Sequence, residues 1–383
     1  MASSQQPTTI DNLQGDVLSE IFIRLLAKQL AQMRCVSNND DILLFFKSKF
    51  SFCGGRPFTA CPSRSPHHEL TDFIKLPVNL QSRQTYGNVI GSVNGLICFN
   101  YGAIHDTSFY IWNPSLSVVL TLPPSLFPSH DTDYLRIPPR FGFDPKSDDY
   151  KVTKFTRDPQ LPLSACLTLD IDDCIETVDY KVEVYSMRKG IWQLVPHRFP
   201  SHLKILRAMH YKEFCVDGHV HWFDYADSFW KVQNIVAFDL GEETFREMPL
   251  PDLQMVATQF SLGVLGGKLC VMFGIRYHGC EVWVMDEYGV AESWVKRYVF
   301  SEFDDVIIPY GFTFHNEFLY EVANYFDNED DHCLGLYNPI AAKTKSFEVG
   351  YGLSKVVEYV DSLVWVAPVE HELSCCNISR LKI

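Results

Sequence analysis

Two short units recur along this sequence at a common spacing of about 50 residues, and this repeat limits the folds that the chain can adopt. The first unit is a turn followed by a run of apolar and aromatic residues that is typical of a strand. Measured at Gly218, Gly267, Asn316 and Ser362, its steps are 49, 49 and 46 residues. Its instances are NGLICF from Asn94, DGHVHWF from Asp217, GGKLCVMF from Gly266, HNEFLYEV from His315 and DSLVWV from Asp361.

The second unit is an apolar run that ends in Asn, Asp or Ser, followed by a polar turn and another run with a bulky residue. Measured at Ser186, Asp239, Asp286 and Asn338, its steps are 53, 47 and 52 residues. Its instances are YIWNPSLSVVLTLPP from Tyr110, VEVYSMRKGIWQLVP from Val182, IVAFDLGEETFREMPLP from Ile235, VWVMDEYGVAESWVKRYVF from Val282 and LGLYNPIAAKTKSFEV from Leu334.

Two interleaved units with one period predict a mainly β fold, a kelch-like β-propeller of about six blades with four strands per blade. A ring of small sheets buries both faces of each sheet and keeps the sheet edges short. The 73-residue interval from Asn113 to Ser186 predicts an insertion, in the acidic loop around Asp170 to Asp179. We expect the strand at Val364 to complete a sixth blade with N-terminal strands such as Phe73 to Val78 or Val89 to Val93.

The N-terminal residues show a helical pattern instead. Asp16 can cap a helix, and two apolar stripes recur every four positions after it. A second short pattern spaced by three follows, so these small helices must bury their apolar faces jointly or against another protein. The stripes are Val17, Ile21 and Leu25, then Leu18, Phe22 and Leu26, and the second pattern is Leu30, Met33 and Val36.

The composition predicts five segments along the chain. A polar N-terminus at 1–10, expected to be disordered, precedes a small α-helical segment at 11–52, which includes the apolar cluster after Asp41. A linker rich in Gly, Pro and Ser follows at 53–72. The β-propeller is expected at 73–370 and a C-terminal tail at 371–383.

Charge and cysteine usage narrow the class of protein. A formal charge of −14 argues against binding to nucleic acid or anionic membranes, because like charges repel. The N-terminus lacks a secretory signal, and no apolar run is long enough to span a bilayer. None of the twelve cysteines forms a C-x-x-C pair, which favours reduced thiols in a cytoplasmic or nuclear protein over disulfides or zinc.

Few residues suggest chemistry. His219 and His221 alternate on one strand near Asp217 and Asp224, so both could contribute ligands to a metal site. No third ligand follows at metal spacing, and we therefore expect a structural role for both histidines. The stretch from Gly263 to Lys268 predicts a hairpin turn rather than a phosphate loop. We therefore predict no catalytic, cofactor-binding or metal-binding residues and no enzymatic activity.

Two acidic clusters are predicted to be solvated loops. They lie at 170–173 and 328–331 and lack the Gly and the final Glu of an EF-hand loop. Contact with calcium or with a basic partner is the alternative for either cluster.

Residues 13–37 resemble the F-box, the helical module that docks onto the Skp1 adaptor of cullin-based ubiquitin ligases. The sequence departs from the family pattern at Gln14, at Leu26-Ala27 and at 38–40, where the family has Pro, Pro-Val and Lys-x-Trp. The positions in register are Leu13, Asp16, Val17, Glu20, Ile21, Arg24, Leu25, Lys28, Leu30, Arg34, Cys35, Val36 and Ser37.

Residues 88–366 resemble the kelch-like F-box-associated domain of plant F-box proteins, a family that includes S-locus F-box proteins. The resemblance is carried, in order, by GSVNGLICF, YIWNPS, FGFDPKSDDYKV, VEVYSMRKGIW, IVAFDL, FREMPLP, LGVLGGKLCV, VWVMDEYGVAESW and LYNP. It implies a role either in pollen–pistil self-incompatibility or in general proteolysis, and both stay open.

Together these resemblances imply the substrate-recognition subunit of a Skp1–cullin–F-box (SCF) E3 ubiquitin ligase. Its helices would dock a Skp1-like adaptor, and through it a cullin, while the propeller would bind the protein to be ubiquitylated. One alternative is a propeller that has lost Skp1 recruitment, and a less favoured one is a sugar-binding propeller or enzyme. The resemblance implies an adaptor interface at Leu13, Val17, Leu18, Ile21, Leu25, Leu30 and Val36.

Overall fold

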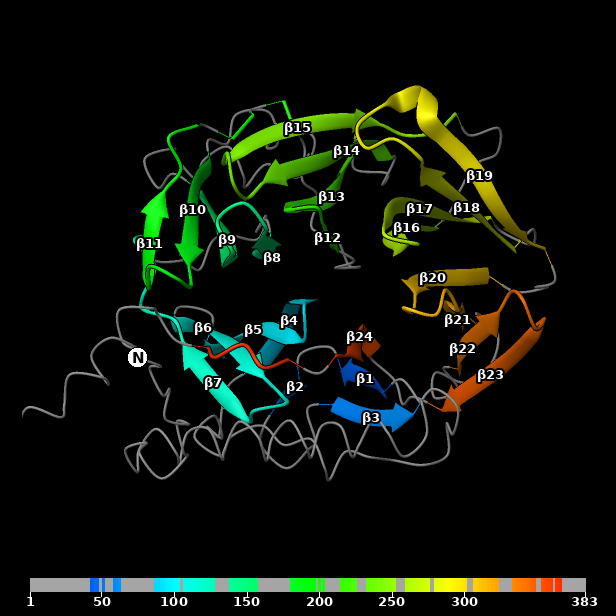
Figure 1. Cartoon of the computed structure of the whole chain (residues 1–383), viewed down its shortest axis with the longest axis horizontal. Helices are drawn as coiled ribbons and strands as arrows, with labels where there is room; N and C mark the ends of the chain where they lie inside the picture. Colours follow the sequence, from blue (N-terminus) through cyan, green and yellow to red (C-terminus); the bar gives the residue numbers. More distant parts are fainter. Residues whose placement is uncertain are drawn as a thin grey trace, which may run out of the picture.

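The chain folds as a ring of six antiparallel sheets in the computed structural model (Figure 1). The residues that the structure describes are almost all in strands, so the predicted mainly β propeller with six blades is confirmed. Within them, no helix is long and apolar enough to cross a membrane. The described residues are 42–47, 50–51, 58–62, 86–103, 106–127, 138–157, 180–197, 199–200, 202–203, 214–225, 232–252, 259–275, 279–301, 306–323, 333–348, 353–360 and 362–366.

Blades 2 to 4 follow one another along the chain. Each is an antiparallel sheet in which neighbouring strands are consecutive, apart from the short β2 that joins β4 in blade 2. Blade 2 comprises β2 (Phe50–Ser51), β4 (Tyr86–Val93), β5 (Leu96–Ala103), β6 (Asp106–Asn113) and β7 (Val118–Thr121). Blade 3 comprises β8 (Arg140–Asp144), β9 (Asp149–Arg157), β10 (Tyr180–Ser186) and β11 (Ile191–Leu194). Blade 4 comprises β12 (Phe214–Val216), β13 (His219–Tyr225), β14 (Val232–Asp239) and β15 (Thr244–Pro249).

Blades 5 and 6 repeat the same topology, and blade 1 combines strands from the two ends of the described part of the chain. Blade 5 comprises β16 (Gln259–Leu265), β17 (Lys268–Ile275), β18 (Gly279–Met285), the 3₁₀ turn η4 (Ala291–Ser293) and β19 (Trp294–Phe300). Blade 6 comprises β20 (Val306–Phe312), β21 (Phe318–Ala323), β22 (Cys333–Asn338) and β23 (Lys343–Glu348). Blade 1 comprises β24 (Leu353–Tyr359), β1 (Ile42–Lys47) and β3 (Phe58–Pro62).

The first sequence unit forms the turn between the first two strands of a blade. Its residues take positive φ angles, 48° at Asn94 and 78° at Gly95, as hairpin turns of the primed types require. Asp217 and Gly218 do the same in blade 4. Gly95 has a second reason to be Gly, because a Cβ there would lie 2.4 Å from the Val360 carbonyl oxygen of blade 1.

The second sequence unit forms the turn between the last two strands of a blade. The Asn113 side-chain oxygen accepts hydrogen bonds from the backbone N–H groups of Ser115 and Leu116, at 2.9 and 3.2 Å. Asp239 and Asn338 make the same pair of bonds two and three residues ahead. A short polar acceptor at the end of the third strand therefore shapes the turn, which explains the recurring Asn and Asp.

All of these turns lie at one end of the ring, which we call the turn face and define by turns 94–95, 217–218, 266–267 and 313–316. Strands alternate in direction, so the turns after the first and third strands of a blade share an end. Neighbouring turns also contact one another. The Gly266 N–H donates to the Asn316 side-chain oxygen at 3.3 Å, for example.

The N-terminal boundary that we predicted is wrong. We expected helix up to residue 52, a linker at 53–72 and a propeller from 73. Instead Ile42–Lys47 is the middle strand of blade 1, paired with β24 on one side and with Phe58–Pro62 on the other. The run ILLFF from Ile42 to Phe46 is buried on both sides, and periodicity cannot distinguish such a strand from a buried helix.

Strand β1 joins the two neighbouring blades. Leu44 and Phe46 pack in a cluster with residues of blade 2, whereas Leu43 and Phe45 pack in a cluster with residues of blade 6. The predicted strand at Val364 is also wrong: it is not a strand, and the Asn113 amide nitrogen donates to its carbonyl oxygen at 2.8 Å.

The other expectations for this region have mixed outcomes. Val89–Val93 belongs to β4 of blade 2 rather than to the sixth blade. The proposed partner strand at 73–78, the acidic insertion at 170–179, the N-terminal 1–41 and the tail 371–383 lie outside the described residues.

A buried ion pair fastens blade 3 to blade 4. The Lys151 Nζ lies 3.0 Å from Asp144 Oδ2 and donates to the Leu240 carbonyl oxygen at 2.6 Å. Burial by itself raises the pKa of the Asp144 carboxyl, but hydrogen bonds from Ser147 and Lys151 and the Lys151 charge lower it below its usual value. The carboxylate is therefore ionised and fully partnered.

We expect Asp144→Asn to lower the free energy of unfolding by about 3 to 5 kcal/mol, because the Lys151 ammonium stays buried without its anion. Urea denaturation followed by tryptophan fluorescence measures this change. The wild-type advantage should be complete above pH 3.8, the ordinary pKa of Asp, and should fall as the pH drops through the lowered pKa.

Lys146→Ala is the matched control, because the Lys146 side chain is 63% exposed and its ion pair with Glu242 lies at the surface. This variant should leave the free energy of unfolding close to the wild-type value, because exposed ion pairs contribute little to stability. Equal effects of the two substitutions would contradict the assignment of Asp144 and Lys151 as a structural pair.

Candidate functional site

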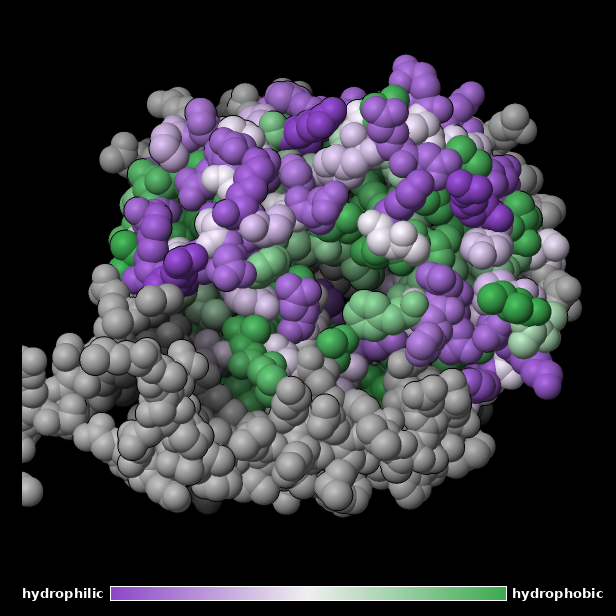
Figure 2. All heavy atoms as spheres, viewed as in Figure 1, coloured by the Kyte–Doolittle hydropathy of each residue, from purple (hydrophilic) through white to green (hydrophobic). Residues whose placement is uncertain are grey.

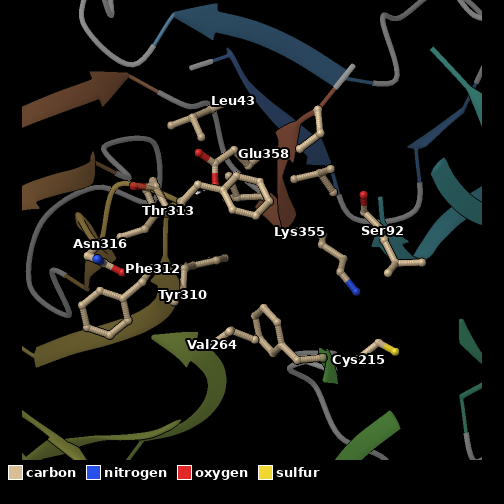
Figure 3. Close-up of a pocket in the computed structure, with 18 of the residues that line it drawn as sticks. Leu43, Ser92, Cys215, Val264, Tyr310, Phe312, Thr313, Asn316, Lys355 and Glu358 are labelled. Carbon is tan, nitrogen blue, oxygen red and sulfur yellow. Dashed lines mark hydrogen bonds between the residues drawn. The ribbon is translucent and has the colours of Figure 1, made fainter. Parts of the chain in front are cut away.

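A cavity of about 530 Å³ lies at the centre of the ring and is lined by residues of the turn face. The innermost strands of five blades contribute to its wall. Leu43, Phe214, Val264 and Phe312 make much of that wall apolar (Figure 3). Figure 2 shows hydrophobic residues around the central hollow, with hydrophilic residues concentrated farther out on the ring.

The backbone of β20 shapes one side of this cavity. Its register with β21 shifts between Pro309 and Gly311, and Gly311 has a φ of 136°, a conformation that favours glycine. Tyr310 and Phe312 on either side of Gly311 both line the cavity. The Tyr310 hydroxyl donates to Glu321 Oε2 at 2.9 Å, and burial raises the pKa of this phenol, so it stays protonated.

Two charged side chains from β24 reach the cavity. Lys355 extends toward the open space, and its Nζ donates to the Ile90 carbonyl oxygen at 2.7 Å (Figure 3). Glu358 Oε2 accepts a hydrogen bond from the Phe314 backbone N–H at 2.8 Å. One cation and one carboxylate therefore leave the interior with little net charge.

Phe314 is an exposed aromatic residue at the mouth of the cavity. Its side chain is 71% exposed, although its backbone is held tightly. The Thr313 N–H donates to the Glu317 carbonyl oxygen at 3.0 Å, and the Asn316 N–H donates to the Thr313 carbonyl oxygen at 2.8 Å. A rigid backbone thus presents a large apolar side chain to solvent.

The cavity has the chemistry of a binding site. Burial raises the pKa of the Cys215 thiol to about 11, so the one cysteine among the lining residues stays protonated near neutral pH. Across the described part of the chain, no three His, Cys, Asp or Glu residues are close enough to hold a metal ion. Apolar walls with a few fixed polar groups suit recognition of a ligand or partner.

The two histidines on β13 connect blades 4 and 5. Their rings lie 6.3 Å apart on one side of the strand. His219 Nε2 is 3.3 Å from Asp239 Oδ2, and His221 Nε2 shares a hydrogen bond of 2.8 Å with the Tyr288 hydroxyl of blade 5. Burial lowers the pKa of His221 to about 4, so this side chain is neutral. These contacts support the structural role that we expected.

The other predicted residues have separate outcomes. Gly263–Lys268 forms the β16–β17 hairpin, as predicted. The acidic clusters at 170–173 and 328–331 lie outside the described residues. So do all members of the predicted adaptor interface, which are Leu13, Val17, Leu18, Ile21, Leu25, Leu30 and Val36.

Sequence reasoning missed the residues that shape the cavity. Phe314 directly precedes the recurring turn at His315 and Asn316, which marks it as a residue of the turn face. Nothing in the local pattern of Lys355 or Glu358 separates them from surface charges, because their placement depends on the pairing of β24 with β1.

Comparisons with known proteins agree with this architecture. The family described as the F-box associated beta propeller domain matches residues 42–367. An F-box/kelch-repeat protein of Arabidopsis thaliana is 23% identical over 321 residues, which cover 78% of this chain and 82% of that protein. The F-box protein CPR1 of Arabidopsis thaliana is 27% identical over 306 residues, which cover 73% of this chain and 71% of CPR1.

Among solved structures, TolB of Acinetobacter baumannii aligns with a TM-score of 0.42 and 7% identity. The alignment covers 85% of this chain and 68% of TolB.

The depressed pKa of His221 predicts a pH dependence of stability. Because the unfolded chain binds this proton with a pKa near 6.5 and the folded chain near 4, stability is lost as the pH falls between these values. His221→Gln should remove on the order of 3 kcal/mol of the change in unfolding free energy between neutral pH and the lower pKa. Urea denaturation across this pH range measures the difference.

His202→Gln provides the control, because its side chain is 64% exposed and pairs with Glu247 at the surface. This variant should keep the wild-type pH profile. An unchanged profile in His221→Gln would show that this histidine is not held neutral by the fold.

Proposed function

Because this chain belongs to the F-box-associated β-propeller family of plant F-box proteins, we propose that it is the substrate-recognition subunit of an SCF-type E3 ubiquitin ligase. The propeller would hold a protein substrate, and the N-terminal residues would recruit a Skp1-like adaptor and through it a cullin. The observation that supports this proposal best is the match of one family across the whole ring, residues 42–367.

The ring supplies the substrate-binding half of the proposal. Its turn face presents an apolar cavity beside an exposed aromatic side chain, and both are held by hydrogen-bonded turns. Rigid aromatic anchors and apolar pockets are typical of protein-binding surfaces. The chain would therefore bring its substrate to the ligase by binding alone.

The adaptor-binding half rests on residues 13–37. We propose that the two apolar stripes bind the adaptor through Leu13, Val17, Leu18, Ile21, Leu25, Leu30 and Val36. Tethering a substrate and a ubiquitin-charged enzyme to one molecule raises the effective concentration of substrate lysines, which is how a receptor without chemistry of its own promotes transfer.

The proposed location is the cytoplasm or nucleus. Cys98, Cys215 and Cys270 are free thiols in the described part of the chain, as expected for a protein of a reducing compartment.

A second candidate is a partner-binding propeller that no longer recruits the ligase. The departures from the F-box pattern at Gln14 and Leu26-Ala27 favour this candidate. The family pattern has proline at Gln14 and at Leu26, and without a proline at position 26 the first helix is not stopped at its usual end. In this case the ring would still bind its partner, and would shield the partner instead of bringing it to a ligase for ubiquitylation.

Co-purification separates the two candidates. Tagged full-length protein should capture Skp1 and cullin, and Ile21→Asp should reduce this capture at least about tenfold by placing a charge on an apolar stripe. Phe314→Ala is the matched control, since its position on the propeller should leave adaptor capture unchanged. No Skp1 capture by protein with a cooperative thermal transition would reject the ligase role and favour the second candidate.

A further inference from the structure

We propose that the central cavity binds a segment of a partner protein that inserts one large apolar side chain and carries basic residues beside it. This inference deepens the proposed function, and it rests on that function for the identification of the partner as a ligase substrate. The residues that carry it are Phe314, the apolar cavity wall and the carboxylates of blades 4 and 5.

The cavity has the size and lining for one large side chain with its flanking backbone. Its volume of about 530 Å³ falls within the range of sites that enclose small organic ligands. Phe214, Val264 and Phe312 face this space from three different blades. An apolar side chain that enters the cavity is removed from contact with water on several sides at once. This burial favours aromatic or long aliphatic side chains, which have the most apolar surface.

Phe314 extends the apolar surface beyond the cavity. Its backbone N–H donates a hydrogen bond of 2.8 Å to Glu358, which holds the backbone in place. Binding of a partner therefore costs little conformational entropy for ordering Phe314. Ile340, which is 92% exposed, lies on the adjacent β22–β23 turn. The two turns are joined by a hydrogen bond of 3.1 Å from the Asn338 amide to Glu317 Oε1.

Blades 4 and 5 carry acidic residues on their turns, at the same end of the ring as the cavity. The carboxylates of Asp217, Glu243, Glu287 and Glu292 form no ion pair with any described residue. Of the nearby cations, Lys146 pairs with Glu242 at 2.9 Å, and the Arg246 guanidinium donates to the Gly289 carbonyl oxygen at 3.1 Å. Lys268 and Arg297 likewise both bind Asp286 at 2.9 Å.

This charge distribution selects the partner. Asp217 follows the cavity-lining Cys215 by two residues, on the turn at the same end of the ring, and we expect it to meet a basic residue next to an inserted side chain. The interior adds no competing net charge, because Lys355 and Glu358 offset each other. A second copy of this chain would bring like charges together, and nucleic acid would be repelled in the same way.

Fluorescence anisotropy of labelled peptides with the full chain tests the proposal. The probe is a short peptide with one central Phe flanked by Lys and Ser, compared with a peptide that has Glu for Lys and one that has Ala for Phe. The Phe–Lys peptide should bind, and both analogues should bind at least about tenfold more weakly. Its affinity should also fall as salt is raised, because exposed charges are screened.

Three variants assign the binding to this surface. Phe314→Ala should weaken binding of the Phe–Lys peptide about tenfold, as for the loss of an aromatic anchor. Asp217→Asn combined with Glu287→Gln should weaken it and reduce its dependence on salt. Leu194→Ala is the control, because this side chain is 49% exposed on β11, the outer strand of blade 3, and the variant should bind as the wild type does.

Several results would overturn the proposal. They are equal binding of the Lys and Glu peptides, unchanged binding by Phe314→Ala, and no measurable binding of the Phe–Lys peptide. Concentration-dependent dimers that Phe314→Ala abolishes would assign the surface to a second copy and would also overturn it. The peptide assay contains no adaptor, so it is independent of the co-purification experiment. If the Phe–Lys peptide does not bind but Skp1 is still captured, only the cavity assignment is rejected. If the peptide binds but Skp1 is not captured, only the ligase role is rejected.

Discussion

The ring depends on one antiparallel pairing, between the first and the last of the strands that the structure describes. Six residue pairs, from Ile42 with Tyr359 to Lys47 with Leu353, join segments about 300 residues apart in the sequence. Closing so long a loop costs conformational entropy, but the cost grows only slowly with loop length. In return, β1 buries Leu44 against blade 2 and Leu43 against blade 6, so both neighbours acquire a packed face. The central cavity exists because this closure brings β24 into the ring.

The parts of the fold that local chemistry determines could be predicted from the sequence. The turns are the clearest example, because Asn94-Gly95 suits a left-handed backbone and Asn113 shapes its turn with its own side chain. Blade 1 could not be predicted in this way. The run from Ile42 is apolar on both sides, so no periodicity marks it as a strand, and its partner is the last strand of the chain.

The candidate site was predictable in kind and not in detail. The propeller follows from the repeat and its partner-binding role from the family resemblance, whereas the structural role of His219 and His221 follows from the missing third ligand. The roles of Phe314 and Lys355 depend on tertiary placement, since both residue types occur widely on protein surfaces. Only the assembled ring shows that one stands at the mouth of the cavity and that the other extends into it.

The sharing of blade 1 between the two chain ends limits how this protein can change in evolution. A gene truncated to begin at residue 73 would encode a ring without β1 and β3, with the apolar faces of blades 2 and 6 left bare. Deletion that reaches past residue 41 therefore destroys the propeller along with any adaptor contact. A descendant that abandons the ligase while keeping its partner must change by substitutions or deletions confined to residues ahead of Ile42. Gln14 and Leu26 are two such positions at which this sequence already departs from the F-box pattern.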